Sequence, residues 1–283
     1  MPVSDTFITN QSLLQEVITR MKQEGAKKLH ILTDFDRTLT TATVDGKPVP
    51  SLISILRNGN YLTPDYATKA HALYNHYAPI ETDLTIPTAE RKQAMEAWWR
   101  AHFKLLIESR LTKTEVNRAI DAGYIRFRDG VKQFLETLAK NDIPVIIMSS
   151  SALGGEAIEW SLKKAGYYFN NITVISNCFI WNEHEQATGV QEPIIHGLSK
   201  DETAIQSFPI FEHIKDRPNV LLLGDNISDL GMVTGFNYQS IIKIGFLNEK
   251  IDRYLPDFQQ HYDLTITNDG TFAAVNNLLQ QII

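Results

Sequence analysis

The chain has 283 residues, of which 43% are hydrophobic and 21% charged, so it is long enough for one large globular domain or a domain with an insert. Its net charge of −6 argues against a nucleic-acid polymer as partner, because phosphate backbones bind basic surfaces, but it allows a small phosphorylated ligand. The single cysteine excludes an intrachain disulfide, and because we find neither a signal sequence nor an apolar run of membrane length, we expect a cytoplasmic protein with no membrane partner.

The first part of the chain predicts a helix, a strand and then a helical insert. Apolar residues at helical spacing over 10–24 predict a helix that stops at Gly25, and residues 29–33 form a short apolar strand. The interval from about 58 to 123 interrupts the alternation of strands and helices. We expect helices in it at 64–77, 88–109 and 112–122, the last opened by a capping pair of Thr112 and Glu115.

Strand and helix patterns alternate after the insert. We expect strands at 143–148, 172–175, 220–223, 241–244 and 264–266, and a hairpin that joins 179–181 to 188–190 around a polar tip. We expect helices at 130–140 with Asp129 as N-cap, at 156–165, after Ser199 with Glu202 as its capping partner, and at 271–283. Alternation of this kind is typical of a parallel sheet with helices on both faces. The sequence therefore predicts an α/β protein with a Rossmann-like, doubly wound sheet formed by 1–57 and 124–283, which carries the helical insert 58–123.

Acidic, hydroxyl and basic side chains stand where the predicted strands end. Asp34 and Asp36 follow the first strand and point the same way, because side chains alternate along a strand. Ser149 follows the strand after the insert, and Lys200 opens a predicted helix. Taken singly, each of these residues is more often a turn or cap residue. The GDNISD segment at 224–229 adds Asp225 and Asp229 at the end of another strand. Ligands bind beyond the carboxyl ends of parallel strands, so the set predicts a site at that edge.

The acids of this set predict a divalent cation. Two unit charges about 4 Å apart repel by roughly 4 kcal/mol at an effective dielectric near 20, so four carboxylates need a counter-cation. Mg²⁺ suits carboxylate, water and phosphate oxygens. Ser149, Lys200 and the amides at the start of the following helix would then bind a phosphate group. One carboxylate can attack phosphorus while a second transfers protons, so the pattern predicts phosphoryl transfer through an aspartyl-phosphate, with water as final acceptor.

These residues resemble the four motifs of the haloacid dehalogenase superfamily of phosphatases. The matching segments, in the order and spacing of that superfamily, are DFDRTL at 34–39, Ser149, Lys200 and GDNISD at 224–229. GFLNE at 245–249, VISN at 174–177 and His196 before Lys200 further resemble cytosolic 5'-nucleotidase III, the pyrimidine 5'-nucleotidases. The resemblance covers nearly the whole chain from about Lys28.

The resemblance implies a role for each matched residue. Asp34 would be the nucleophile and Asp36 the acid and base. Mg²⁺ would be bound by the Asp34 carboxylate, the Asp36 backbone carbonyl and Asp225, with Asp229 beside them. Ser149, Ser150 and Lys200 would bind the phosphate. The insert 58–123 would be a cap that closes over a nucleoside 5'-monophosphate, a pyrimidine one first, and Glu96 in the cap would contact the base.

Two departures from the family pattern bear on substrate choice. The second motif reads Ser149-Ser150-Ser151 where the family usually has Ser-Ala-Gly, and Arg37 replaces a residue that is usually apolar. An alternative is a phosphatase of the same mechanism that acts on a phosphoamino acid or a sugar phosphate. A second alternative is a regulatory phosphoacceptor protein. A Glu on a helix such as the one bearing Glu96 is as often solvated. We expect a monomer whose partner is a small phosphomonoester.

Overall fold

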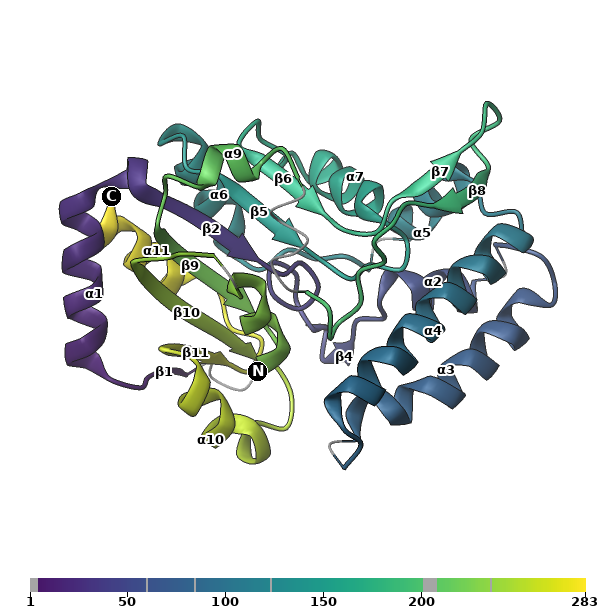
Figure 1. Ribbon diagram of the computed structural model, residues 1–283, viewed down its shortest axis with the longest axis horizontal. Coiled ribbons are helices and arrows are strands. Elements are labelled where there is room, and N and C mark those ends of the chain that lie inside the picture. The colour runs from purple at the N-terminus through teal and green to yellow at the C-terminus, as the bar shows by residue number, and fades with distance from the viewer. Residues whose placement is uncertain (1–4, 60, 84, 123, 201–207, 235) are drawn as a thin grey trace.

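The structure is a computed structural model that describes residues 5–59, 61–83, 85–122, 124–200, 208–234 and 236–283. Its main element is a seven-stranded sheet with the order β1-β11-β10-β9-β2-β5-β6 (Figure 1). The strands are β1 (Thr6–Ile8), β2 (Leu29–Thr33), β5 (Val145–Met148), β6 (Ile172–Ile175), β9 (Asn219–Gly224), β10 (Ser240–Leu247) and β11 (Leu264–Thr267). All neighbouring pairs are parallel except β1, which runs antiparallel to β11 at the edge.

Helices cover both faces of this sheet because its central strands are apolar on both sides. Ile31 of β2 packs on one face and Leu32 on the other, and both are fully buried. The first face is covered by α1 (Gln11–Glu24), α6 (Val131–Lys140), α7 (Gly155–Ala165) and α11 (Ala273–Ile282). The second is covered by α9 (Phe211–Ile214), η2 (Ile227–Val233) and α10 (Ile251–His261). The fold is therefore the predicted doubly wound α/β sheet.

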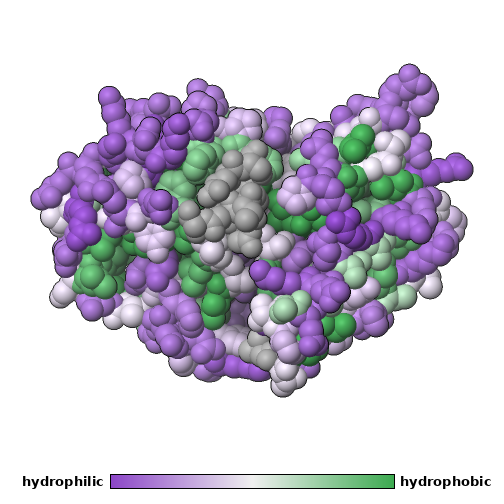
Figure 2. Space-filling model, in the orientation of Figure 1, coloured by the Kyte–Doolittle hydropathy of each residue, from purple (hydrophilic) through white to green (hydrophobic). Residues whose placement is uncertain are grey.

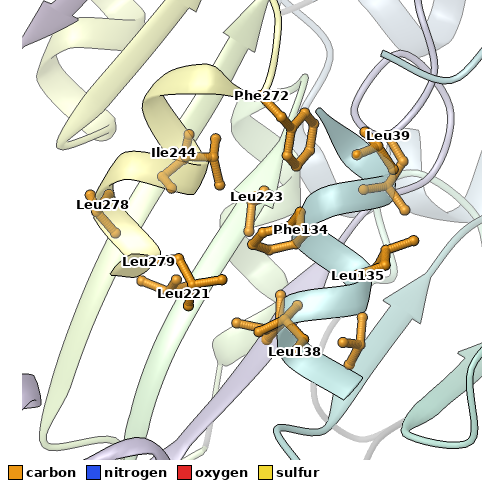
Figure 3. Packing of buried hydrophobic residues seen from close by; sticks show 14 of the residues in the cluster. Leu39, Phe134, Leu135, Leu138, Leu221, Leu223, Ile244, Phe272, Leu278 and Leu279 are labelled. Carbon is orange, nitrogen blue, oxygen red and sulfur yellow. The ribbon is translucent and has the colours of Figure 1, made fainter. Parts of the chain in front are cut away.

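The core of the first face is drawn in Figure 3. Phe134 and Leu138 of α6 point toward Leu221 and Leu223 of β9, and Leu279 of α11 reaches the same layer. All five side chains are at most 1% exposed. Burial of such a side chain stabilises a fold by about 1.5–3 kcal/mol, so this layer anchors the strands whose ends carry the predicted site.

The helical insert packs beside the sheet, at the right of Figure 1. Its helices are α3 (Tyr66–Thr82), α4 (Thr88–Glu108) and α5 (Lys113–Asp121). The short hairpin of β3 (Thr43–Val44) and β4 (Lys47–Pro48) and the helix α2 (Leu52–Asn58) precede it. These helices share an apolar core with α7 and the hairpin β7 (Phe179–Trp181)–β8 (Ala187–Val190). Phe103 of α4 contacts Phe179 of β7 edge-on at 5.6 Å between ring centroids. The far end of this hairpin is hydrophilic, as predicted (Figure 2).

Several local predictions were wrong or incomplete. Asp129 is not the N-cap of α6; Gly130 holds that place with a φ of 91°, a left-handed conformation that Gly adopts at little cost. Thr112 bonds the Glu115 side chain instead of capping the backbone of α5. The sequence patterns also missed β1, β3, β4, α2, α9 and α10, the last of which contains Pro256. The helix predicted after Ser199 with Glu202 falls outside the described residues. Over the described residues, no helix combines the length and apolarity needed to cross a membrane.

Candidate functional site

The predicted edge of the sheet brings several of the singled-out residues together. β2 lies between β5 and β9, so the residues after these three strands meet at their carboxyl ends. The Asp34 amide donates to the Leu223 carbonyl over 3.0 Å, and the Ser149 amide donates to the Ile175 carbonyl over 3.0 Å. These bonds extend the parallel pairing by one residue and hold both side chains at the rim.

Lys200 lies between two buried carboxylates at this rim. Its Nζ donates to Asp34 Oδ1 and, over 3.0 Å, to Asp229 Oδ1. Lys200 is 7% exposed, Asp34 4% and Asp229 1%. Charges taken out of water in this way are tolerated when they are paired and hydrogen-bonded. The ammonium group is therefore the counter-charge of the two acids.

Asp229 is held by the turn that follows β9. Its Oδ2 accepts bonds from the Asp225 and Asn226 amides, each 3.0 Å long, while the Asn226 side chain caps η2 by accepting from the Ser228 amide. Gly224 makes this turn possible, since a Cβ there would lie 2.5 Å from Asp229 Cβ. The turn after Gly224 thus places Asp225 and Asp229 side by side at the rim.

Burial and mutual repulsion raise the pKa values of these acids. Burial, together with the Asp229 charge, raises the pKa of Asp34 to about 7 against the opposing effect of Lys200. Burial, Asp229 and Asp34 also raise the pKa of Asp225 well above its usual value. Burial alone would lower the pKa of Lys200, but the Asp229 and Asp34 carboxylates raise it above its usual range. One ammonium group thus leaves part of the negative charge uncompensated.

This surplus of negative charge fits a hard divalent cation. Asp34, Asp225 and Asp229 each offer a carboxylate oxygen, and these three oxygens lie within 4.8 Å of one another. Oxygen donors at this spacing are what Mg²⁺ and similar ions bind, with water or phosphate completing the shell. The Asp36 carboxylate is not part of this group, which is the one found among the described residues. Asp229, expected beside the metal, belongs to this group of three.

Asp36 and the two serines line the same rim without joining the acid cluster. Asp36 is half-buried, and burial raises its pKa against the opposing charges of Lys200 and Arg37. Ser149 is buried, and Ser150 is half-buried. Helix α7 begins at Gly155, within one residue of the predicted start, and a turn joins it to the serines.

Glu96 lies on α4, on the part of the insert that contacts the sheet domain. Trp99, one turn along, donates its indole N–H to the Ser150 carbonyl over 3.3 Å, so this face of α4 reaches the serine loop. Glu96 Oε1 pairs with Arg100 at 2.7 Å, and its Oε2 lies 3.9 Å from His196 Nε2. The Glu96 side chain is 37% exposed and therefore accessible to a ligand.

Sequence reasoning missed a buried polar network behind Asp36. Arg128 is 2% exposed and donates to the carbonyls of Arg37 and Thr38, and it pairs with Asp269 at 2.9 Å. Burial lowers the pKa of Arg128 to about 10, against the opposing charge of Asp269. The Arg37 side chain itself lies 3.4 Å from Glu249. Arg128 stands alone before the Asp129-Gly130 turn and belongs to no recognisable motif, so nothing in the sequence singled it out.

Comparison with known proteins places the chain among nucleotidases. A sequence model described as pyrimidine 5'-nucleotidase (UMPH-1) matches residues 37–283. The 7-methylguanosine phosphate-specific 5'-nucleotidase A of Xenopus laevis is 32% identical over 268 residues, 94% of this chain and 92% of that protein. The crystal structure of cytosolic 5'-nucleotidase IIIB bound to cytidine superposes with a TM-score of 0.86 at 25% identity, covering 98% of this chain and 93% of that one. An apo phosphoserine phosphatase shares the fold, with a TM-score of 0.52 at 16% identity over 88% of this chain and 97% of its own.

Proposed function

We propose a substrate class and a mechanism for this chain, which belongs to the pyrimidine 5'-nucleotidase (UMPH-1) family and is a 5'-nucleotidase of the haloacid dehalogenase fold. It is a phosphatase that hydrolyses nucleoside monophosphates. We propose that the phosphoryl group passes through a covalent aspartyl-phosphate on Asp34. The observation that carries this proposal is the buried group of Asp34, Lys200, Asp225 and Asp229 at the carboxyl end of the sheet.

Asp34 is the proposed nucleophile and Asp36 the proposed acid and base. An Asp34 oxygen attacks phosphorus while the bond to the nucleoside 5'-oxygen breaks, and Asp36 gives that oxygen its proton. Asp36 then takes a proton from water as the water attacks the aspartyl-phosphate, which releases phosphate and restores Asp34. Burial raises the pKa of Asp36, which favours its protonated form and so supports its role as the acid.

Mg²⁺ is the proposed cofactor. Asp34, Asp225 and the Asp36 backbone carbonyl would hold it, with Asp229 beside them, and when bound it would supply the positive charge that offsets the phosphate and the acids. Ser149, Ser150 and Lys200 would bind the remaining phosphate oxygens by hydrogen bonds and charge. The chain's own ammonium group is thus shared between the acids and the incoming phosphate.

The insert 58–123 is the proposed cap over the nucleoside, with the sheet domain formed by 1–57 and 124–283. Glu96 is the proposed contact to the base, because a carboxylate accepts hydrogen bonds from the exocyclic amine of cytosine. The structural relative bound to cytidine supports a pyrimidine substrate. The curated relatives named for 7-methylguanosine phosphate support a second candidate, whose base carries a positive charge that a carboxylate also attracts. We also propose a monomer that acts in the cytoplasm, as the name of the cytosolic structural relative suggests.

A substrate panel tests the proposed specificity. The kcat/KM of the purified protein would be measured with and without Mg²⁺ on CMP, UMP, 7-methyl-GMP, GMP, AMP, a sugar phosphate and phosphoserine. We expect activity only with the metal, and the highest values for CMP, UMP or 7-methyl-GMP. The nucleotide assignment fails if the sugar phosphate or phosphoserine is hydrolysed as well as these.

A single substitution tests the proposed mechanism. Asp34→Asn removes the nucleophile and should abolish turnover, whereas Asp216→Asn in an exposed loop should leave it unchanged. Undiminished hydrolysis by Asp34→Asn contradicts the aspartyl-phosphate. A stable phosphorylated wild-type protein that never turns over would instead favour a regulatory phosphoacceptor.

A further inference from the structure

We propose that Arg128 is a positioning residue that fixes the loop carrying Asp36 through its buried guanidinium group. This inference rests on the proposed function, because it assigns Arg128 the task of placing the proposed acid. Arg128 itself does not reach the reacting atoms. It acts on the backbone of the two residues that follow Asp36.

The guanidinium group of Arg128 donates hydrogen bonds to three backbone carbonyls, two of them in the loop after Asp36. Nε donates to the Thr38 carbonyl over 2.8 Å and Nη2 to the Arg37 carbonyl over 2.5 Å. Nη1 donates to the Gly270 carbonyl over 2.8 Å. Arg carries five donors in a rigid plane, so contacts to successive carbonyls fix both position and orientation. The guanidinium group also lies over the Phe246 ring, 4.5 Å from its centroid, and Arg128 is 2% exposed.

Asn248, which follows β10, and Asp269, which follows β11, complete this arrangement. Asp269 pairs with Arg128 and accepts bonds from the Ala42 and Thr43 amides, each 2.8 Å long. Asn248 accepts from Arg128 Nη2 over 2.7 Å and donates to the same Arg37 carbonyl over 3.0 Å. The segment 37–43 is therefore held at both ends by one buried network.

The backbone at Arg37 needs this support. Arg37 has a φ of 58°, the left-handed conformation that non-Gly residues rarely adopt and that persists when surrounding contacts impose it. Its carbonyl receives two of the contacts just described. Without them the turn after Asp36 would relax, and the Asp36 carboxyl would move away from the substrate oxygen that it protonates.

Arg128 also lies where the segment that leads toward the insert pairs with the segment that returns from it. The Thr41 amide donates to the Arg126 carbonyl over 2.8 Å, and the Arg128 amide donates to the Leu39 carbonyl over 3.0 Å. Thr40 and Phe127 form an antiparallel bridge between these two contacts. Arg128 thus connects the paired segments 39–41 and 126–128 to the loop that follows Asp36.

Leaving-group dependence distinguishes positioning of the acid from general damage. A nucleoside 5'-oxygen leaves only when it gains a proton, whereas the nitrophenolate of p-nitrophenyl phosphate leaves without one. The kcat/KM value reports the steps up to this bond cleavage. A misplaced Asp36 therefore slows nucleotide hydrolysis far more than hydrolysis of the activated ester, while a partly unfolded protein slows both equally.

The experiment compares Arg128→Lys and Asn248→Ala with wild type on p-nitrophenyl phosphate and on the nucleotide that wild type hydrolyses fastest. We expect Arg128→Lys to lower kcat/KM for the nucleotide about 100-fold and for the activated ester less than about threefold. Asn248→Ala should lower kcat/KM for the nucleotide about 10-fold and again affect the activated ester much less. This second variant tests the proposal even if Arg128→Lys does not fold. Arg20→Lys on the exposed face of α1 is the matched control and should change neither value.

Asp36→Asn separates this inference from the proposed function. If Asp36→Asn discriminates between the two substrates and the folded Arg128 and Asn248 variants do not, the positioning role is overturned while the mechanism stands. If Asp36→Asn treats both substrates alike, the acid role itself is wrong and the inference falls with it. Equal losses on both substrates in folded variants would likewise assign Arg128 to the scaffold alone.

Discussion

Lys200→Met removes the ammonium group that bonds both Asp34 and Asp229 and keeps most of the apolar stem. At 3.0 Å and an effective dielectric near 20, each lost ion pair is worth roughly 5 kcal/mol of Coulomb energy, part of which the missing desolvation of the lysine returns. Removal of one partner from a buried pair costs about 3–5 kcal/mol in practice. We therefore expect the free energy of unfolding to fall by about that amount when no metal is bound.

Urea unfolding in EDTA and in saturating Mg²⁺ measures this effect. We expect the difference between wild type and Lys200→Met to be largest in EDTA and to shrink in Mg²⁺, because a bound divalent cation replaces the lost counter-charge. Lys22→Met on the exposed side of α1 is the control and should change stability by less than about 0.5 kcal/mol. A loss below about 1 kcal/mol in EDTA, or a gap that widens with Mg²⁺, would refute the reasoning that lysine and metal balance the same acids.

Three further predictions follow from local geometry. Gly224→Ala places a Cβ 2.5 Å from Asp229 Cβ, so we expect kcat to fall about 100-fold through displacement of that carboxylate, and wild-type kinetics would contradict this. Burial lowers the pKa of His30 from 6.5 to about 4, so between these pH values the unfolded state binds more protons than the folded state. The free energy of unfolding of wild type should therefore fall by about 3 kcal/mol as the pH falls from 6.5 to 4. His30→Gln should remove this pH dependence in urea unfolding, and an equal pH dependence in both proteins would contradict the role of His30. Arg100→Ala breaks two solvent-exposed ion pairs, with Glu192 and with Glu96, so the free energy of unfolding should fall by less than about 1 kcal/mol. A loss above about 2 kcal/mol in urea unfolding would contradict this small effect.

Local sequence pattern determined most of the sheet. The β-branched and apolar runs of β2, β5, β6 and β9 predicted strands within one or two residues of their observed ends, because a fully buried strand must be apolar along its length. Strands that alternate with helices are typical of a parallel sheet, and parallel strands end at one edge. The sequence by itself therefore indicated that Asp34 and Asp225 would lie close together.

Tertiary structure alone decided how that edge is held. The edge strand β1 has only three residues, too few for a clear pattern, and it exists because it pairs with β11. The helix α10 has apolar residues at helical spacing, but Pro256 within it argues against a helix in the sequence. Arg128, Asn248 and Asp269 lie far apart in the chain, and their contacts with segment 37–43 span up to 227 residues. Hydrogen bonds of this kind leave no periodicity in the sequence, because each depends on a donor and an acceptor that only the folded chain brings together.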